Sequence, residues 1–309
     1  MTGTSQTAPD DPGRGTSRRG RPDPGTEAFL AHRNLLFTVA YEILGSAADA
    51  EDVLQETWLR WSGVGIETVE NQRAYLVRIT TRLALTRLRT LGRRKESYVG
   101  PWLPEPLLTT PDVAEDVELA DSVSIAMLLV METLTPIERA VFVLREVFDL
   151  DYDEIADAVD KKPPAVRQIA HRAKAHVAAR RPRTVVSAAD TRQALEAFQR
   201  AVGTGDLQGL LDILAPDVVL LGDGGGIAPA AIAPVVGVDD VMSVLSRIAT
   251  RAPGQLAQVN GHPALVFRLD GGIDTVMAVR IDDGRISGLY AVRNPEKLSR
   301  MEEETALHR

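Results

Sequence analysis

The chain has 309 residues, of which 44% are hydrophobic and 25% charged, and its formal net charge is −8. This length allows two or three domains of ordinary size. Because no apolar run approaches the roughly 18 residues of a membrane span, no membrane association is expected. The lack of cysteine excludes disulfides and thiolate metal sites and fits a cytoplasmic protein. The five histidines are scattered, so neither a metal site nor a cofactor is expected.

The N-terminal third predicts a tail followed by three helices. Residues 1–25 are rich in glycine and proline and predict a disordered tail. Apolar residues then recur at helical spacing over residues 26–45 and 47–61. A long third helix is expected over residues 73–94, with arginines facing outward. The second helix has an opposite, polar face that consists of Asp49, Asp52, Gln55 and Glu56.

Positive charge is segregated along the chain. Residues 73–95 hold eight Arg or Lys and no acidic residue, and residues 161–183 also hold eight and none. Each basic block follows an acidic one, at 49–56 and 149–160. A single run of this kind is usually a solvated helix face, whereas two unmixed positive blocks indicate a polyanionic partner. The local charge therefore favours nucleic-acid binding although the whole chain is acidic.

Residues 152–177 are typical of a helix-turn-helix. Two amphipathic helices are separated by "DKK", which is about the length that the turn requires. Asp160 stands where such turns often have glycine, and the second helix begins with proline instead of a capping side chain. Arg and Gln on its outer face can read base edges, while other cations hold phosphates. An ordinary helical hairpin with a basic face is the alternative. The outward set is Arg167, Gln168, His171, Arg172 and Lys174.

Residues 187–300 predict an α+β unit. Two short helices precede β-branched runs such as "DVVLLGD", "HPALVFRL", "TVMAVRID" and "RISGLYAVRN", which turn signals separate. A helix near "DDVMSVLSRIA" interrupts the series. The pattern predicts a curved antiparallel sheet with helices.

Taken in order, these segments resemble the extracytoplasmic-function (group IV) sigma factors of bacterial RNA polymerase, over about residues 26–183. "LGSAADAEDVLQETWLRW" resembles the part of region 2 that binds the β′ coiled coil. "ENQRAYLVRITTRLALTRLR" resembles the part that opens and reads the −10 element, although many members have Asn at Arg82 and Asp at Thr86. Residues 134–177 resemble region 4, which reads the −35 element.

The resemblance implies two partners, core RNA polymerase (β′ coiled coil and β flap) and promoter DNA. It places core binding on Asp49, Asp52, Gln55 and Glu56, and −35 binding on the outward set of the helix-turn-helix. Contacts to the −10 element are implied for Asn71, Gln72, Arg78, Arg82, Arg87 and Arg89.

The C-terminal third resembles the SnoaL-like fold, a cone of curved sheet and helices that one subgroup of these sigma factors carries. Three short motifs accompany it in that subgroup, and here they read "WLPEP", "DGGG" and "NPEKL", with Glu for the usual Asp in the last. The resemblance implies that this domain regulates the sigma core in cis, with no separate anti-sigma factor required. The implied regulatory residues are Trp102, Leu103, Pro104, Glu105, Pro106, Asp223, Gly224, Gly225, Gly226, Asn294, Pro295, Glu296, Lys297 and Leu298.

The stretch "YVGPWLPEPLL" (98–108) is expected to dock against the C-terminal domain. Its three prolines forbid a helix, yet Trp102, Leu103 and Leu107 are too apolar for a solvated tether. Burial would contribute roughly 1.5–3 kcal/mol for each of them. The surface near "DGGG" or "NPEKL" is the expected cover.

The predicted fold is therefore multidomain, with two all-α sigma domains and a C-terminal α+β domain. The expected segments are a tail (1–25), region 2 (26–96), a linker with WLPEP (97–121), region 4 (122–183), a SnoaL-like regulatory domain (187–300) and a second tail (301–309).

The rival interpretation is a DNA-binding regulator fused to a SnoaL-type enzyme or small-molecule sensor. Its pocket would be lined by Asp223, Asn260, His262 and Tyr290, since an Asp or His in an apolar cone can act as a general base. Spacing identifies no acid and base pair, and fold-level analogy does not transfer an activity. No catalytic residue and no enzyme activity are predicted, while a small ligand in the cone stays open.

Overall fold

The computed structural model describes residues 23–181, 186–248 and 254–309. Most of the expected N-terminal tail lies outside these ranges. Its last residues are helical instead, because Asp23 caps the first helix and Pro24 suits the first turn. Among the residues described, no helix is both long and apolar enough to cross a membrane.

Three helices form the N-terminal bundle, as the apolar spacing predicted. Gly45 ends the first helix in the left-handed conformation, and Ser46 caps the second. A short 3-10 turn (Ile66–Thr68) then leads to Asn71, which caps the long basic helix. The bounds are α1 (Pro24–Leu44), α2 (Ala47–Trp61) and α3 (Gln72–Glu96).

The second helical domain begins earlier than the expected linker end at 121. Thr110 and Pro111 start one short helix, and Asp116 caps the next by accepting from the Leu119 amide. Thr135 forms a capping box, and Asp160, at the position where such turns often have glycine, is left-handed (φ 54°). The elements are α4 (Pro111–Glu115), α5 (Val117–Val123), α6 (Ile125–Met131), α7 (Pro136–Phe142), a π-helical turn (Val143–Val147), α8 (Tyr152–Val159) and α9 (Pro163–Ala178).

The C-terminal domain is a six-stranded sheet with order β2-β1-β6-β5-β4-β3. The expectation of a wholly antiparallel sheet was wrong, because β1 and β6 pair in parallel. After β1 the chain forms β2 and α12, and then the strands β3, β4 and β5. The last strand, β6, lies beside β1 in the sheet. The elements are α10 (Ala188–Thr204), α11 (Leu207–Ile213), β1 (Leu214–Asp223), β2 (Val235–Val236), α12 (Val238–Ile248), β3 (Gln255–Val259), β4 (His262–Leu269), β5 (Gly272–Asp282), β6 (Arg285–Val292) and α13 (Pro295–Leu298).

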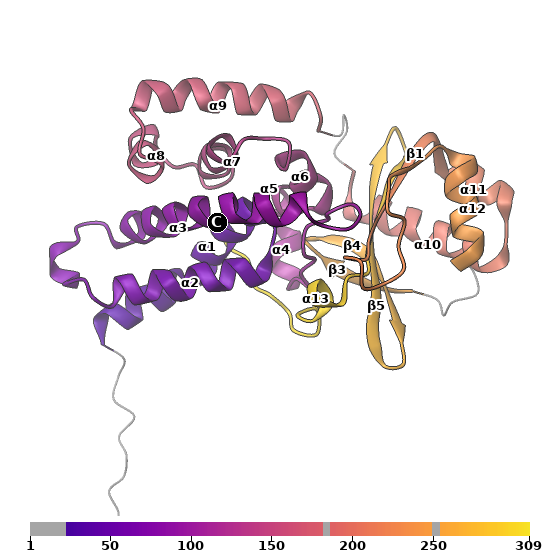
Figure 1. Ribbon diagram of the computed structural model, residues 1–309, viewed down its shortest axis with the longest axis horizontal. Helices are drawn as coiled ribbons and strands as arrows, with labels where there is room; N and C mark the ends of the chain where they lie inside the picture. The colour runs from indigo at the N-terminus through magenta and orange to yellow at the C-terminus, as the bar shows by residue number, and fades with distance from the viewer. Residues whose placement is uncertain (1–22, 182–185, 249–253) are drawn as a thin grey trace, which may run out of the picture.

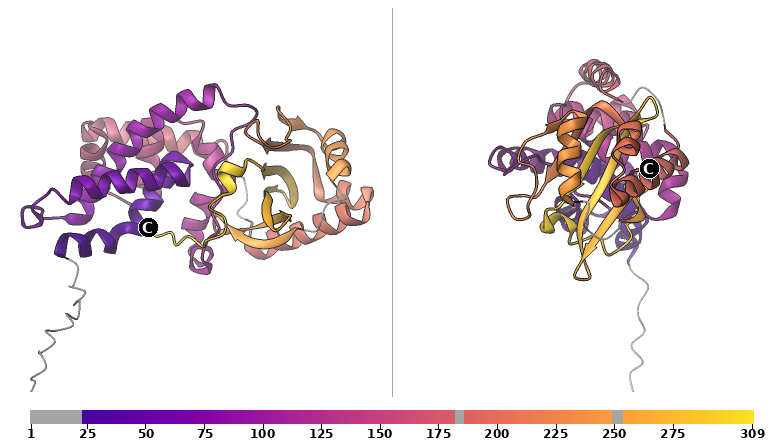
Figure 2. Two further views of the ribbon diagram at one scale, coloured as in Figure 1. Left: turned by 60° about the horizontal axis from the view of Figure 1, so that its bottom comes forward. Right: turned by 90° about the vertical axis from the view of Figure 1, so that its right-hand side faces the viewer.

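The two faces of this sheet meet different parts of the molecule (Figure 1). One face packs on α10 to α12 through an apolar cluster that includes Leu265 and Met277. The other face packs on the linker and α6, through a cluster in which Leu103 and Ile125 join Val276. The C-terminal segment then runs back to the N-terminal helices (Figure 2). The sheet thus lies between its own helices and the sigma-like part.

Candidate functional site

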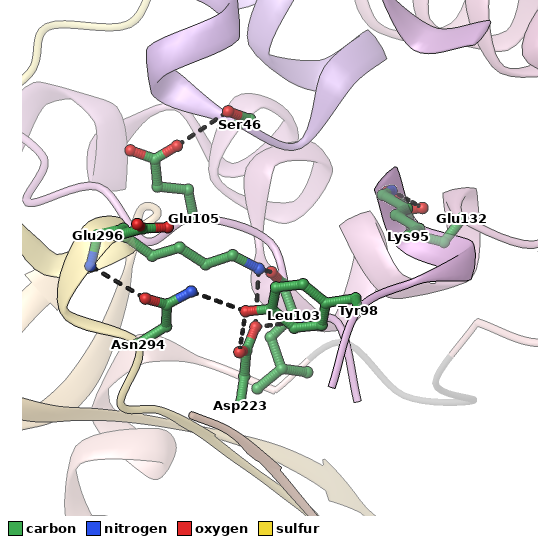
Figure 3. Close-up of polar contacts among 10 residues, drawn as sticks. Ser46, Lys95, Tyr98, Leu103, Glu105, Glu132, Asp223, Asn294 and Glu296 are labelled. Atoms are coloured by element: carbon green, nitrogen blue, oxygen red, sulfur yellow. Dashed lines mark hydrogen bonds and ion pairs between the residues drawn. The ribbon is translucent and has the colours of Figure 1, made fainter. Parts of the chain in front are cut away.

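The three short motifs meet at one buried carboxylate. Asp223, at the end of β1, has no solvent exposure. Its Oδ1 accepts a hydrogen bond from the Tyr98 hydroxyl (Figure 3). Its Oδ2 accepts from the Leu103 backbone amide at 2.8 Å and forms an ion pair with Lys297 Nζ at 2.7 Å. One side chain of the C-terminal domain therefore binds the linker at two places.

Lys297 completes this junction from α13. Its ammonium also donates to the Leu103 carbonyl at 2.6 Å and lies 3.5 Å from the centroid of the Trp102 ring, a cation–π contact. Burial lowers the pKa of Lys297 to about 8, and the neighbouring Asp223 opposes that shift. Asn294 caps α13 and donates to the Tyr98 hydroxyl at 2.8 Å. Asp223, Asn294 and Lys297 thus each bind a linker group across the domain boundary.

The glycines of "DGGG" let the linker approach this closely. Gly225 and Gly226 have φ values of 62° and 73°, which favour glycine. A Cβ on Gly225 would lie 2.4 Å from Asn294 Nδ2 and 3.0 Å from the Tyr98 hydroxyl. A Cβ on Gly224 would lie 2.0 Å from the Ala228 carbonyl oxygen. Only the motif's glycines are compatible with this turn and this contact.

Glu105 attaches the same linker to the N-terminal bundle. Its carboxylate accepts from the Ser46 hydroxyl at 3.0 Å and the Ala48 amide at 3.2 Å, at the start of α2 (Figure 3). The Tyr41 hydroxyl donates to the Glu105 carbonyl at 2.7 Å. Burial raises the pKa of Glu105. Within "WLPEP", Leu103 therefore faces the C-terminal domain and Glu105 faces the N-terminal bundle.

Asn260 forms a second junction, in the turn between β3 and β4. Its side chain accepts from the Leu107 amide at 2.9 Å and donates to the Tyr41 hydroxyl (2.6 Å) and the Val123 carbonyl (2.8 Å). It is fully buried with φ 53°, a conformation that Asn tolerates. One amide therefore joins the sheet, the linker, α1 and α5.

The C-terminal strap (residues 302–309) makes a third attachment. The Thr305 amide donates to the Leu108 carbonyl at 2.7 Å, and the His308 amide donates to the Thr38 hydroxyl at 3.0 Å. Leu307 is buried in the core cluster of the helical part, and Arg309 pairs with Asp116 and Glu118. The sequence predicted only a tail at 301–309, and the structure adds that this segment packs on the linker and the N-terminal helices. Leu307 in an otherwise polar stretch was the available signal.

The outer face of α9 is exposed, as the helix-turn-helix pattern predicted. Arg167 lies over the Tyr152 ring at 5.4 Å, and Lys174 pairs with Glu146 at 2.6 Å. The exposed residues on this face are Arg167, Gln168, His171, Arg172 and Lys174.

The acidic face of α2 and the basic face of α3 contact each other. Arg87 forms ion pairs with Asp49 and Asp52, both at 2.6 Å. Asp49 is only 4% exposed, although it belongs to the polar face of α2. It sits in the first turn of α2, where Arg87 covers it. Asp52, Gln55 and Glu56 are exposed.

The other residues implied in −10 binding follow α3. Asn71 and Arg89 are exposed, whereas Gln72 and Arg78 are partly buried. Arg82 is exposed and donates to the Asp157 carbonyl of α8 at 2.7 Å. The basic face of α3 is thus partly engaged by neighbouring helices.

Comparison with known proteins places these features in a family. Sigma-70 region 2 matches residues 28–94, and Sigma-70 region 4 matches residues 124–177. The ECF RNA polymerase sigma factor SigJ of Mycobacterium tuberculosis is 34% identical over 289 residues, which cover 88% of this chain and 92% of SigJ. The crystal structure of that SigJ superposes with a TM-score of 0.73 at 32% identity, covering 89% of this chain and 99% of SigJ. This chain belongs to the ECF sigma factors.

The sigma factor carries a C-terminal extension with the expected α+β architecture. Its function is that of an alternative sigma factor, and its regions 2 and 4 imply binding to core RNA polymerase and promoter DNA. The packing of the linker on the extension agrees with the apolar character of "WLPEP": Leu103 is fully buried and Trp102 partly buried.

The rival enzyme pocket does not assemble in this sigma factor. Asp223 and Asn260 use their side chains at the two junctions, and they hold different stretches of the linker. Tyr290 lies in the cluster between the sheet and the linker. His262 lines a pocket beside α5. Within "NPEKL", Asn294, Lys297 and Leu298 are buried, whereas Pro295 and Glu296 are exposed.

Proposed function

We propose that the SnoaL-like domain regulates this sigma factor in cis by holding the linker between regions 2 and 4. The observation that carries the proposal is the buried Asp223 carboxylate, which binds Tyr98 and the Leu103 amide of the linker. A sigma factor engages two promoter elements at once. A clamp on the connection between its two DNA-reading domains changes the effective concentration of one domain at the second element. No separate anti-sigma protein is needed for this control.

The proposal assigns core polymerase binding to the acidic face of α2. Asp52, Gln55 and Glu56 face the β′ coiled coil, and Asp49 supports them by holding Arg87 in place. Region 4 binds the β flap. Changing Asp52 to Ala should weaken co-purification with core polymerase and leave the DNA affinity of region 4 unchanged.

The proposal assigns DNA contacts to the two basic helices. The α9 set reads the −35 element, and Arg167→Ala or Gln168→Ala should reduce affinity for that element. The residues assigned to the −10 element are Asn71, Gln72, Arg78, Arg82, Arg87 and Arg89. Because Arg82 and Arg87 hold α8 and α2 in this arrangement, binding of the melted strand would compete with those contacts.

Removal of residues 187–309 tests the regulatory role. The shortened and full-length proteins are compared in promoter-dependent transcription with purified core polymerase. We expect their activities to differ, since the shortened chain loses the Asp223, Asn260 and Leu307 attachments. Tyr98→Phe in the full-length chain is a second, milder test, because it removes only one hydroxyl from the junction. Equal transcription by all three proteins would show that cis regulation is wrong.

A further inference from the structure

Regions 2 and 4 pack directly on each other along a seam. Apolar residues of both regions belong to one buried cluster, and α8 contacts α3. Arg139 of α7 is only 2% exposed, and its Nε donates to the Glu42 carbonyl of α1 at 2.8 Å. The Ser122 hydroxyl donates to the Glu42 side chain, also at 2.8 Å. Buried polar contacts therefore hold region 4 on region 2 in addition to the apolar packing.

A sigma factor that engages both promoter elements has to open this seam. Both α3 and α9 contact α8, so their axes lie two helix packing distances apart, about 20 Å. The −10 and −35 elements are centred roughly 25 base pairs apart, which is about 85 Å of duplex. Residues that stabilise the closed seam therefore decide how readily region 4 can leave region 2.

Glu132 connects the seam to the end of α3. Its Oε1 accepts from Arg139 Nη1 at 2.6 Å, and its Oε2 forms an ion pair with Lys95 Nζ, in the last turn of α3 (Figure 3). The three side chains are at most 22% exposed. Burial lowers the pKa of Lys95, and the neighbouring Glu132 opposes that shift. One carboxylate of region 4 thus binds a cation of its own region and a cation of region 2.

Trp102 connects Lys95 to the SnoaL-like domain. The Lys95 ammonium lies 5.2 Å from the centroid of the Trp102 ring, within the range of a cation–π contact. The ammonium of Lys297, which pairs with Asp223, lies 3.5 Å from the same centroid. Two ammonium groups, one from region 2 and one from the C-terminal domain, therefore contact one linker ring.

We propose that Lys95 is a positioning residue that couples docking of the SnoaL-like domain to the closed seam between regions 2 and 4. In the docked state, Trp102 and Glu132 hold the Lys95 ammonium, and Lys95 in turn holds Glu132 beside Arg139. When the linker leaves the domain, Lys95 loses the contact with Trp102, and the seam opens more readily. This inference rests on the cis regulation proposed above and names the residue that transmits it.

A double-mutant cycle between Trp102→Leu and Lys95→Met, in the full chain without polymerase or DNA, tests the coupling. The Arg139 Nε proton is buried and bonded to the Glu42 carbonyl, so its exchange rate, measured by NMR, reports opening of the seam. Each single change should raise that rate. The double variant should exchange about threefold or more slowly than the product of the two effects predicts, which is the range of a cation–π contact. Independent, multiplicative effects would overturn the proposal.

Two further variants separate the charge of Lys95 from its packing. Lys95→Arg keeps the cation and should retain the slow exchange of the wild type. Arg93→Met removes an exposed cation from the same turn of α3, and as the matched control it should change the rate by less than about twofold. Near-UV circular dichroism confirms that each variant is folded. Exchange as fast in Lys95→Arg as in Lys95→Met would contradict a role for the charge.

A second cycle starts from the C-terminal domain. Asp223→Ala removes the partner of Lys297 and should raise the exchange rate of the Arg139 Nε proton. The increase should be smaller when Lys95 is already Met, because the connection is then broken. Equal fold increases in both backgrounds would refute the coupling through Lys95, even if removal of residues 187–309 changes transcription. Cis regulation would then stand and act by another route, so the two proposals fail separately.

Discussion

The two faces of the C-terminal sheet are both buried but differ in chemistry. The face toward α10 to α12 is an apolar core containing Phe198, Leu265 and Leu289. The face toward the sigma core mixes apolar residues with buried Asp223 and Lys297, which find their partners in the linker or beside it. Apolar packing stabilises without selecting one partner, whereas a buried charge tolerates only an arrangement that satisfies it. The first face holds the domain together, and the second specifies how the linker docks.

The largest effect is expected at Asp223. Asp223→Ala should reduce the free energy of unfolding of the docked state by about 3–5 kcal/mol, because Lys297 is left buried and unpaired. Urea unfolding followed by tryptophan emission measures this, since Trp102 lies at the junction. The double change Asp223→Leu with Lys297→Met should recover much of the loss. If Asp223→Ala is as stable as the wild type, the buried charges do not distinguish this face of the sheet from the apolar one.

A matched change on the other face is Leu265→Ala. Leu265 is fully buried, so the cavity should cost about 3 kcal/mol. The two variants should differ in hydrogen exchange: the Leu103 amide loses its acceptor in Asp223→Ala and keeps it in Leu265→Ala. If the Leu103 amide exchanges equally fast in both variants, its protection reflects the stability of the whole domain and not the bond to Asp223.

Asn260 separates side-chain from backbone contributions at the second junction. Asn260→Ala should cost about 2–3 kcal/mol, because the Leu107 amide and the Val123 carbonyl lose their partner in a buried site. Asn260→Gly loses the same bonds but tolerates φ 53°, so it should be about 1 kcal/mol more stable than the Ala variant. Denaturant unfolding of the three proteins provides the comparison. Equal stability of the Ala and Gly variants would show that the left-handed backbone at residue 260 does not contribute to the free energy of unfolding.

A buried carboxyl, that of Glu42, also lies where region 2 contacts region 4. Glu42 is fully buried; its side chain accepts from Ser122 and its carbonyl from Arg139. Burial raises the pKa of Glu42 to about 8, above the value of about 4.3 for an unfolded chain. The folded state therefore binds the extra proton, and this stabilisation is complete below pH 4 and lost as pH rises through 8.

Glu42→Gln tests this pH dependence. The wild-type free energy of unfolding should decline between pH 5 and 8 by up to about 1.4 kcal/mol per pH unit, and the variant should decline less. Urea titrations at three pH values provide the slopes. Identical slopes for the two proteins would show that Glu42 takes up no proton on folding.

Local features of this fold could be predicted from the sequence, because neighbouring residues determine them. The turn at Asp160 and the proline start of α9 depend on a few adjacent residues. The three short motifs likewise marked the first junction.

Long-range placement could not be predicted in the same way. The parallel pairing of β1 with β6 depends on how distant strands assemble. Asn260 could be identified as a turn residue, but its bonds to Tyr41 and Leu107 join segments more than 100 residues away. Leu307 is buried among helices that lie far from it in the sequence, so its role follows from the assembled structure.

Transcription from reconstituted holoenzyme tests the central claim most directly. Full-length wild type, Asp223→Ala and Leu265→Ala are each combined with core polymerase, at a temperature where all three remain folded. Cis regulation through the linker predicts that Asp223→Ala changes the yield of promoter-specific transcript, while Leu265→Ala matches the wild type. Equal yields from all three proteins, or equal changes in the two variants, would contradict it.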